Sequence, residues 1–290
     1  MSDQRSFETI YSQVMDRQGA ELQRFRQDHP PKRVVVAQTD WEYLDSGTSD
    51  EVILLLVGGL RMADAAYRNI PMLDDDFRVI TPSYPALNTM SELVDGLAAI
   101  LDREGISAAH VLAGSFGGML AQVFIRRHPD KVRKLILSTT AVLDDDSAAR
   151  YRQLMALLEP MDQATVTQVA QEQMFNIIAP PEFDHAFYRA YLNELYTYRV
   201  DKQALLSTYR CLIDFAENWK LSPDDLTDWK GDMLILESDD DATFDESMRS
   251  RVRRLYPFAQ THIFHGAGHS PGTTQRDKYF EVVKTFLRRS

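Results

Sequence analysis

The sequence of 290 residues contains a single cysteine, Cys211, and lacks any long apolar run. One cysteine excludes an intrachain disulfide framework, a redox thiol pair and any cysteine-based zinc or iron–sulfur site. The longest apolar stretch, residues 52–60, is too short for a transmembrane helix, which needs roughly twenty residues. The N-terminal residues also lack the apolar core and the small-residue cleavage site of a signal peptide. We therefore expect a cytoplasmic protein without a membrane span.

Basic residues are in the minority as well. The chain has 32 lysines and arginines against 43 acidic residues, which gives a net charge of −11. No basic run offsets this balance, so the sequence lacks the electrostatic footprint of a nucleic-acid-binding protein. The composition, 44% hydrophobic and 26% charged, is that of a globular protein with a substantial core. We expect its partner to be a small molecule and not a nucleic acid.

Strands and helices alternate through most of the chain. After two short strands at 33–38 and 41–44, the pattern predicts strands at 52–57, 77–81, 109–113 and 132–138, and helices at 62–73, 91–103 and 116–127. It resumes later with strands at 233–236 and 261–264 and helices at 247–255 and 278–288. Such repetition is typical of a parallel sheet covered by helices, with ligands bound at the carboxyl ends of the strands.

Residues 143–230 interrupt this alternation and hold most of the acidity. They carry 15 acidic and 8 basic residues, a net charge of −7, and 12 of the 29 aromatic residues. Their hydrophobic periods are helical throughout, over 148–158, 163–177, 182–198 and 202–219, with prolines between them. We predict a helical cap inserted between two strands of one sheet. Its acidity would weakly repel polyanions such as coenzyme A.

The N-terminal segment is predicted to form one or two amphipathic helices over residues 4–28. The apolar positions recur at three- and four-residue spacing and are Phe7, Ile10, Tyr11, Val14, Met15, Leu22 and Phe25. This arm either covers the core or binds a second subunit of a homo-oligomer. The expected organisation is therefore an arm at 1–32, a core at 33–142 and 231–290, and a cap at 143–230.

Ser115 is the strongest candidate for a nucleophile. It lies between a predicted strand and a predicted helix, with Gly114, Gly117 and Gly118 beside it. A strand, a serine and a helix joined by small residues form a nucleophile elbow, in which a tight turn lifts the hydroxyl above the sheet. Ala113 stands where glycine is usual, which adds a single methyl group. The alternative is a plain glycine-rich turn.

The order of elements resembles the α/β-hydrolase fold over residues 33–290, which implies a mostly parallel eight-stranded sheet with helices on both faces. In this family the catalytic acid follows the strand after the cap, and the histidine follows the last strand. The segment 234–241 resembles the family's acid motif and puts Asp241 in the acid position. The segment 265–271 matches its histidine loop and makes His269 the base. A serine, a histidine and an aspartate in these roles would form an acyl-enzyme.

Two other acidic groups compete with Asp241. Asp239 and Asp240 precede it directly, and only the register of the motif favours Asp241. The run 144–146 follows the strand before the cap, where some family members place their acid. Of the remaining histidines, His262 and His265 belong to the last strand or its end. The others are expected to be structural or solvated, and are His29, His110, His128 and His185.

The oxyanion that forms during acyl transfer needs two N–H donors. The residue after the nucleophile, Phe116, supplies the first of these backbone donors. The loop after strand 52–57 supplies the second, and the resemblance aligns Gly59 with that position. Val57 stands where the family usually has histidine, which leaves the rigidity of this loop open. A simple turn at Gly58 and Gly59 is the alternative.

Within the fold, the sequence is most similar to the maspardin-like branch. The matching segments are residues 25–26, 32–36, 41–45, 63–64, 68–70, 78–80, 84–85, 120–122 and 255–257. Animal members of this branch are regarded as interaction proteins and lack the histidine of the last loop. The resemblance therefore implies an alternative function as a non-catalytic binding or scaffold protein. His269 favours catalysis instead.

The type of nucleophile narrows the chemistry. Haloalkane dehalogenases and epoxide hydrolases of this fold use aspartate, so Ser115 argues against both, and the oxyanion motif of prolyl aminopeptidases is missing. Esters, lactones, thioesters, carbon–carbon bonds beside a ketone and acyl transfer remain. No cofactor or metal is implied. The cap is expected to line a pocket for a small or medium, largely apolar substrate. Most of its apolar residues should pack the cap helices on each other, and about a quarter should reach the substrate; these residues are Met155, Met161, Met174, Phe175, Phe183, Phe187, Tyr188, Tyr191, Tyr196 and Tyr198.

Overall fold

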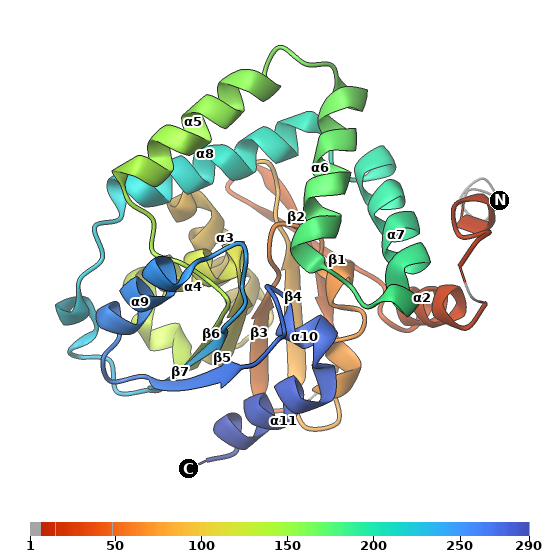
Figure 1. Ribbon diagram of the computed structural model, residues 1–290. Coiled ribbons are helices and arrows are strands. Elements are labelled where there is room, and N and C mark those ends of the chain that lie inside the picture. Colours follow the sequence, from red (N-terminus) through yellow and green to blue (C-terminus); the bar gives the residue numbers. More distant parts are fainter. Residues whose placement is uncertain (1–6, 15, 48, 290) are drawn as a thin grey trace.

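The computed structural model, which describes residues 7–14, 16–47 and 49–289, is built around an eight-stranded sheet (Figure 1). The strands are β1 (Lys32–Val36), β2 (Thr39–Asp45), β3 (Val52–Leu56), β4 (Arg78–Ser83), β5 (Ala109–Gly114), β6 (Val132–Ser138), β7 (Asp232–Ser238) and β8 (Gln260–Phe264). Their spatial order is β1-β2-β4-β3-β5-β6-β7-β8. The strand β2 is antiparallel to β1 and β4, and the pairs from β4 to β8 are parallel. The prediction of a mostly parallel eight-stranded sheet is confirmed.

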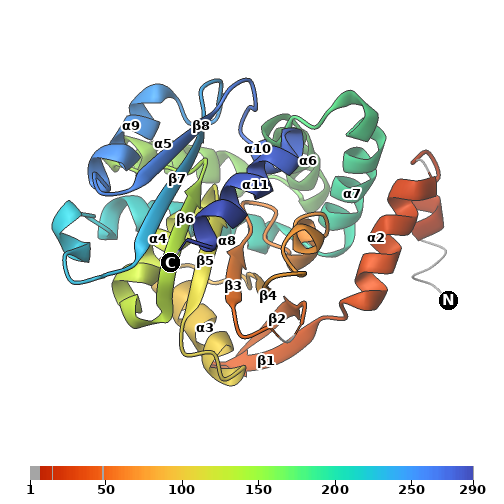
Figure 2. The same cartoon turned by 90° about the horizontal axis from the view of Figure 1, so that it is seen from below.

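The central strands are buried because helices cover both faces of the sheet. All five residues of β3 are buried, as its uninterrupted apolar sequence predicts. The helices α3 (Met90–Arg103) and α4 (Phe116–Arg127) lie on one face, and α11 (Arg276–Leu287) crosses the other (Figure 2). Two further helices, α9 (Glu246–Leu255) and the short α10 (Pro271–Thr274), belong to the C-terminal part. A one-turn 3₁₀ helix, η3 (Pro129–Lys131), leads into β6.

The helix expected over residues 62–73 is wrong. The structure has two short 3₁₀ turns there, η1 (Ala63–Ala66) and η2 (Ile70–Met72). Pro71 lies inside η2; its ring has no N–H to donate and clashes with the preceding turn of an α-helix. Ala63, Ala66, Tyr67, Ile70 and Leu73 are still buried, so the apolar spacing reflects packing against the core and not a continuous helix.

Four helices lie between β6 and β7 and form a layer above the sheet (Figure 1). They are α5 (Asp145–Leu158), α6 (Gln163–Ile178), α7 (His185–Tyr198) and α8 (Lys202–Asn218), with 3₁₀ turns η4 (Glu182–Asp184) and η5 (Pro223–Leu226). We call residues 143–230 the helical insertion. Three of its aspartates are N-caps, which accept the first free N–H groups of their helices, and these are Asp144, Asp162 and Asp201. Three of the acidic residues of this segment therefore serve as helix N-caps.

The N-terminal arm lies against the helical insertion. Residues 7–10 are helical, and α2 (Asp16–Asp28) runs beside α7 (Figure 2). Leu22 and Phe25 are buried, as their spacing predicts. Tyr11 donates a hydrogen bond of 2.6 Å to Glu194 on α7, and Gln18 donates one of 2.5 Å to Asp184. Residues 4–6 and Met15 lie outside the described residues.

Cys211 lies at the contact between the insertion and the core. It is fully buried on α8, and its sulfur is 3.3 Å from the carbonyl oxygen of Leu87, between β4 and α3. Burial raises the pKa of this thiol to about 12. Among the described residues, no helix combines the length and the apolar character that crossing a bilayer requires.

Candidate active site

Ser115 occupies a strained turn between β5 and α4. Its φ of 50° and ψ of −121° are rarely adopted by residues with a side chain. The hydrogen bond from Ser115 N–H to the carbonyl oxygen of Ser138, at 3.0 Å, ties the turn to the end of β6. The Ser115 carbonyl accepts from the Thr140 hydroxyl at 2.8 Å and from Gly118 N–H at 2.9 Å. These contacts hold the backbone in its strained conformation.

Gly117 allows the helix after Ser115 to approach the sheet. A Cβ atom at this position would lie 2.3 Å from the carbonyl oxygen of Leu56 and 2.5 Å from that of Val57. Both contacts are with backbone atoms, so no side-chain movement would relieve them. Ala113, where the family usually has glycine, is fully buried within β5 and keeps regular pairing with Leu56 and Leu137.

The structure brings Ser115, His269 and Asp241 together in one hydrogen-bonded chain. His269 Nε2 lies 3.0 Å from Ser115 Oγ, and His269 Nδ1 lies 2.9 Å from Asp241 Oδ2 and 3.0 Å from Oδ1. Asp241 is buried after β7, and His269 is buried in the loop after β8. The carboxylate also accepts from the N–H groups of Thr243 and Phe244, at 2.8 and 3.1 Å. These three side chains come from separate strand ends that meet at one edge of the sheet.

The two neighbouring aspartates hold the loop that carries His269. Asp239 accepts hydrogen bonds from His265 Nδ1 at 2.6 Å and from Gly266 N–H at 3.0 Å. Asp240 accepts from Gly268 N–H at 2.8 Å and from the Ser238 hydroxyl at 2.6 Å. The bonds from Ser238 and from Gly268 hold the pKa of Asp240 below its ordinary value.

The other candidates from the sequence lie in different surroundings. Asp144 caps α5 and forms an ion pair with Arg251. Among the described residues, His269 is the one histidine bonded to Ser115. The remaining rings bond to acidic side chains or backbone carbonyls where a partner is recorded, as for His29, His110, His128, His185 and His265.

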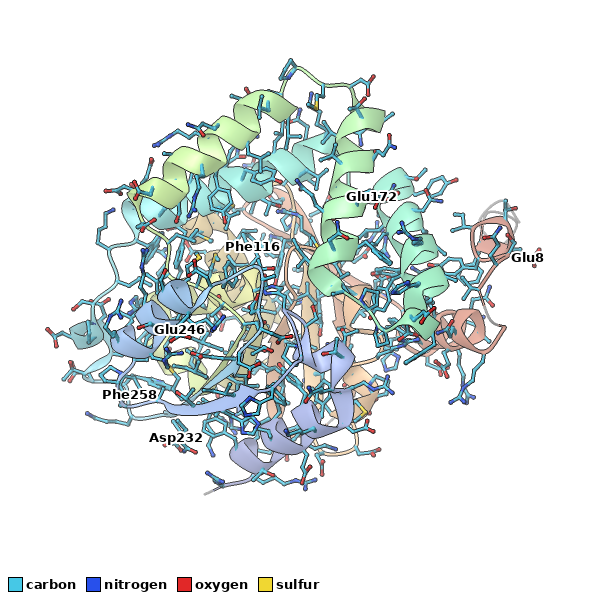
Figure 3. All side chains as sticks on the ribbon, viewed as in Figure 1. Glu8, Phe116, Glu172, Asp232, Glu246 and Phe258 are labelled. Atoms are coloured by element: carbon cyan, nitrogen blue, oxygen red, sulfur yellow. The ribbon has the colours of Figure 1, made fainter. Side chains whose placement is uncertain are left out.

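The two expected oxyanion donors, Phe116 and Gly59, both line the cavity at Ser115. Phe116 is the first residue of α4, so its N–H has no carbonyl partner within the helix. The position of a Cβ on Gly58 would be 3.3 Å from Ser115 Cβ, so the loop that contains Gly59 passes directly over the elbow. Phe116, labelled in Figure 3, lies near the centre of the view, between the sheet and the helical insertion. Gly59 in turn faces Met174 of α6, whose Cε would be 3.1 Å from an added Cβ.

A cavity of about 1040 Å³ adjoins Ser115 and His269. The insertion contributes apolar walls from α5, α6 and α8, among them Tyr151, Leu154, Ile177, Tyr209 and Leu212. Of the ten apolar cap residues singled out in the sequence, four line the cavity: Met174, Phe183, Tyr188 and Tyr191. Others pack away from it, such as Phe187 in the core, while Tyr198 is exposed. The arm also reaches the cavity, through Arg17, Gln18 and Glu21, which no local sequence signal indicates.

The acidity of the helical insertion does not gather at this cavity. Asp184 is the one acidic residue of the insertion among the described lining residues. Its carboxylate pairs with Arg68 at 2.8 Å and accepts from Gln18. From the arm and the core, the lining includes the basic residues Arg17, Arg276 and Lys278 and the acidic residues Glu21 and Asp277. The expectation that the insertion repels polyanions from the site is therefore not supported by the placement of its charges.

Within the described residues, no group of three or more histidine, cysteine, aspartate or glutamate side chains is arranged to hold a metal ion. The groups with hydrogen-bond geometry suited to acyl chemistry are those of the Ser115 chain, with the loop around Gly59 beside them. This set can accept a proton, attack a carbonyl carbon and donate hydrogen bonds to an oxyanion.

Curated relatives are similar to this chain over different lengths. A 2-hydroxy-6-oxononadienedioate/2-hydroxy-6-oxononatrienedioate hydrolase of Dechloromonas aromatica is 23% identical over 266 residues, 84% of this chain and 89% of that protein. Maspardin of Danio rerio is 29% identical over 121 residues, 39% of each chain. The maspardin resemblance is therefore present but covers less of the chain than the resemblance to these hydrolases.

Solved structures share the architecture. A hydrolase from Pseudomonas aeruginosa has a TM-score of 0.73 at 16% identity and covers 90% of this chain and 99% of its own. A thermophilic esterase from Thermogutta terrifontis has a TM-score of 0.70 at 19% identity, with 89% and 98% covered. The family model for the alpha/beta hydrolase fold matches residues 51–272, about three quarters of the chain. The chain therefore belongs to the alpha/beta hydrolase fold family.

Proposed function

We propose that this protein is a serine hydrolase in which Ser115, His269 and Asp241 form the catalytic triad. The observation that carries the proposal is the continuous chain of hydrogen bonds from Ser115 Oγ through both ring nitrogens of His269 to Asp241. A nucleophile bonded to a base, and a base oriented by a third group, is the arrangement that activates a serine. The substrate is a small or medium, largely apolar ester, lactone or related acyl compound.

In the proposed mechanism, His269 Nε2 takes the proton of Ser115 as the hydroxyl attacks the substrate carbonyl carbon. Asp241 keeps the proton of the ring on Nδ1 and stabilises the imidazolium that forms. The N–H groups of Phe116 and Gly59 bind the oxyanion. His269 then protonates the leaving group, and the acyl-enzyme is hydrolysed by water through the same steps. The roles of base and acid alternate on one histidine.

The helical insertion acts as the cap in this proposal. Its aromatic and aliphatic side chains form the walls of the cavity above Ser115. A volume of about 1040 Å³ is at the upper end of small-molecule pockets, so it accepts substrates larger than a short ester. Closure of these walls would exclude bulk water during attack.

A second candidate reaction is hydrolysis of a carbon–carbon bond beside a ketone. The relative from Dechloromonas aromatica is named for 2-hydroxy-6-oxononadienedioate, a compound with a ketone in its chain. The same triad could serve either bond, since both reactions need an activated oxygen nucleophile and a stabilised oxyanion. The described lining holds four basic residues, Arg17, Arg68, Arg276 and Lys278, and three acidic ones, Glu21, Asp184 and Asp277. This small excess of positive charge is a reason to include a substrate that carries a carboxylate.

Turnover and active-site labelling test the proposal. The wild type should hydrolyse p-nitrophenyl butyrate or a 2-hydroxy-6-oxodienoate and should react with a fluorophosphonate probe. Ser115→Ala should lower kcat by about 10⁴-fold or more and prevent labelling, because it removes the nucleophile.

Ser138→Ala is the matched control, because Ser138 also lines the cavity but is not bonded to His269. It should retain labelling. Absence of turnover and of labelling in the wild type, or survival of both in Ser115→Ala, would contradict catalysis. Either result would favour the alternative function as a non-catalytic binding or scaffold protein.

A further inference from the structure

The loop that passes over Ser115 is closed by an arginine in a strained conformation. Arg61 has a φ of 65°, in the left-handed region that favours glycine. Its N–H donates to the carbonyl oxygen of Gly58 at 3.1 Å, which makes residues 58–61 a tight turn. Gly59 lies at the second position of this turn. A strained backbone of this kind persists only where surrounding contacts fix it.

Tyr84 fixes both ends of this loop. Its N–H donates to the carbonyl oxygen of Arg61 at 2.9 Å, and its hydroxyl donates to the carbonyl oxygen of Val57 at 2.8 Å. The ring also packs edge-on against Phe116, with ring centroids 5.9 Å apart. The loop is therefore held from below by the segment after β4, although it lacks the family's histidine at position 57.

The guanidinium of Arg61 adds a third set of contacts. Its Nη2 donates to the carbonyl oxygens of Pro85 at 2.7 Å and Tyr84 at 3.2 Å. Its Nη1 donates to the Thr208 hydroxyl on α8 at 2.6 Å. The side chain thus joins the oxyanion loop, the segment after β4 and the helical insertion.

The chemistry of these contacts is unusual for a buried cation. Arg61 is 1% exposed, and burial lowers the pKa of its guanidinium. The acceptors recorded for it within the described residues are neutral carbonyl and hydroxyl oxygens. A buried charge without a carboxylate partner is costly. A shorter apolar side chain would avoid that cost but would leave the loop without these bonds.

We propose that Arg61 is a positioning residue that holds the Gly59 N–H toward the oxyanion formed at Ser115. This inference rests on the proposed function. In this proposal Arg61 keeps the loop over Ser115 rigid, because Val57 stands where the family usually has histidine. The effect should fall on the transition state more than on the bound substrate, because an oxyanion hole stabilises charge that develops only during attack.

The principal test compares Arg61→Asn, Arg61→Lys and Arg126→Met. Asparagine tolerates the left-handed backbone but cannot reach Pro85 or Thr208. Lysine keeps the charge as a single point donor and is expected to be intermediate. Arg126 is the matched control: it is a partly buried arginine bonded to Asp225, Tyr256 and the carbonyl oxygen of Gln122, and it is not among the lining residues of the cavity.

For p-nitrophenyl butyrate, Arg61→Asn should lower kcat by about 10- to 100-fold, somewhat less than the loss of a whole oxyanion donor, with KM changed by less than about threefold. Affinity for a trifluoromethyl ketone, which forms an oxyanion adduct with the serine, should fall by the same factor. Affinity for the matching methyl ketone should change little. Arg126→Met should leave the ratio of the two affinities at the wild-type value.

Amide hydrogen exchange of residues 57–62 gives a second readout that does not need turnover. Faster exchange there in Arg61→Asn, and not in Arg126→Met, supports the inference. Unchanged kcat and unchanged exchange in Arg61→Asn, or an equal loss of the trifluoromethyl ketone preference in Arg126→Met, overturns it. If Arg61→Asn does not fold, Arg61→Lys carries the same comparison. If the wild type lacks turnover, the proposed function fails, and the exchange measurement alone judges Arg61.

Discussion

Three consecutive aspartates after β7 bond to different parts of the histidine loop. Asp241 bonds to the His269 ring, whereas Asp239 and Asp240 bond to the backbone N–H groups of Gly266 and Gly268. From the sequence, only the register of a family motif favours Asp241, because three adjacent carboxylates differ in no local property. The direction of each side chain depends on where β8 and its loop return, which is a long-range feature. The role of Arg61 could not be predicted for the same reason, because the partners of its guanidinium are 23 to 147 residues away in sequence.

Substitution of each aspartate by asparagine should distinguish the residue that orients the His269 ring from the two that hold the backbone of its loop. Asp241→Asn should lower kcat by about 10⁴-fold, because the amide can no longer hold the correct tautomer of His269. Asp239→Asn and Asp240→Asn should lower kcat by about tenfold at most, since each still offers an oxygen to the loop. Steady-state kinetics on one ester would measure all three. An equal loss in Asp240→Asn and Asp241→Asn would reject the assignment of the acid.

At the scale of elements, a buried ionic cluster joins the arm, η1 and α7. Asp64 on η1 accepts from Arg26 of α2 at 2.8 Å and from the Tyr191 hydroxyl at 3.0 Å, and it also pairs with Arg199. Arg26 bonds to Glu194 at 2.8 Å as well. Asp64 and Arg26 could be noted in the sequence only as short matches to a family. Their meeting with α7 could not be predicted, since the partners are more than one hundred residues away.

Local pattern predicted most elements but failed where one residue overrode it. The apolar spacing in 62–73 is helical, yet Pro71 divides the segment into η1 and η2. The predicted helix over 182–198 similarly begins with the 3₁₀ turn η4 before α7. The strands were easier to predict, because a parallel sheet with covered faces requires continuous apolar runs.

Loss of the Asp64 charge should destabilise the protein. Asp64→Asn removes the buried carboxylate that Arg26 and Arg199 share and leaves them only the more exposed Glu194 and Glu42. We expect a loss of about 3 kcal/mol in the free energy of unfolding at pH 7. Urea denaturation would measure it. Glu172→Gln, which breaks the exposed pair with Arg189 on the surface of the insertion, should change this free energy by less than about 0.5 kcal/mol.

The contribution of Asp64 to the free energy of unfolding should decrease as the pH falls. Burial alone would raise the pKa of Asp64, but the pairs with Arg199 and Arg26 outweigh it and lower that pKa below its ordinary value. The stabilisation is therefore present above the pKa of the unfolded chain, near 4, and is lost as the pH falls through the folded value. The difference in unfolding free energy between wild type and Asp64→Asn should shrink from pH 7 to pH 3. A constant difference would contradict this role of Asp64.

At the scale of the whole molecule, the cavity belongs to three parts of the chain at once. The core supplies Ser115 and His269, the helical insertion supplies the apolar walls, and the arm supplies Gln18 and its neighbours. The break in alternation at residue 143 predicts helices between two strands, and four helices lie there, between β6 and β7. The participation of the arm could not be predicted, because its amphipathic pattern shows that one face is buried but not what covers it.

The single buried cysteine, Cys211, can report movement of the helical insertion relative to the core. The sulfur of Cys211 touches Leu87 across the boundary between α8 and the core, one helical turn from Ser207 and Thr208. With a pKa raised to about 12 and no exposure, the thiol should react with iodoacetamide at pH 8 only when α8 moves away. We expect alkylation at least about 100-fold slower than in the urea-unfolded chain, because only the open fraction is reactive.

The alkylation rate of Cys211 therefore reports the fraction of molecules in which α8 has moved away from Leu87. If the labelling rate falls when substrate analogues occupy the cavity, opening of the helical insertion and access to Ser115 are the same motion. If the rate is insensitive to them, access to Ser115 does not depend on movement of α8. The alkylation rate of Cys211, whose thiol is unreactive in the closed protein, thus measures how often α8 and the helices packed with it move away from the core.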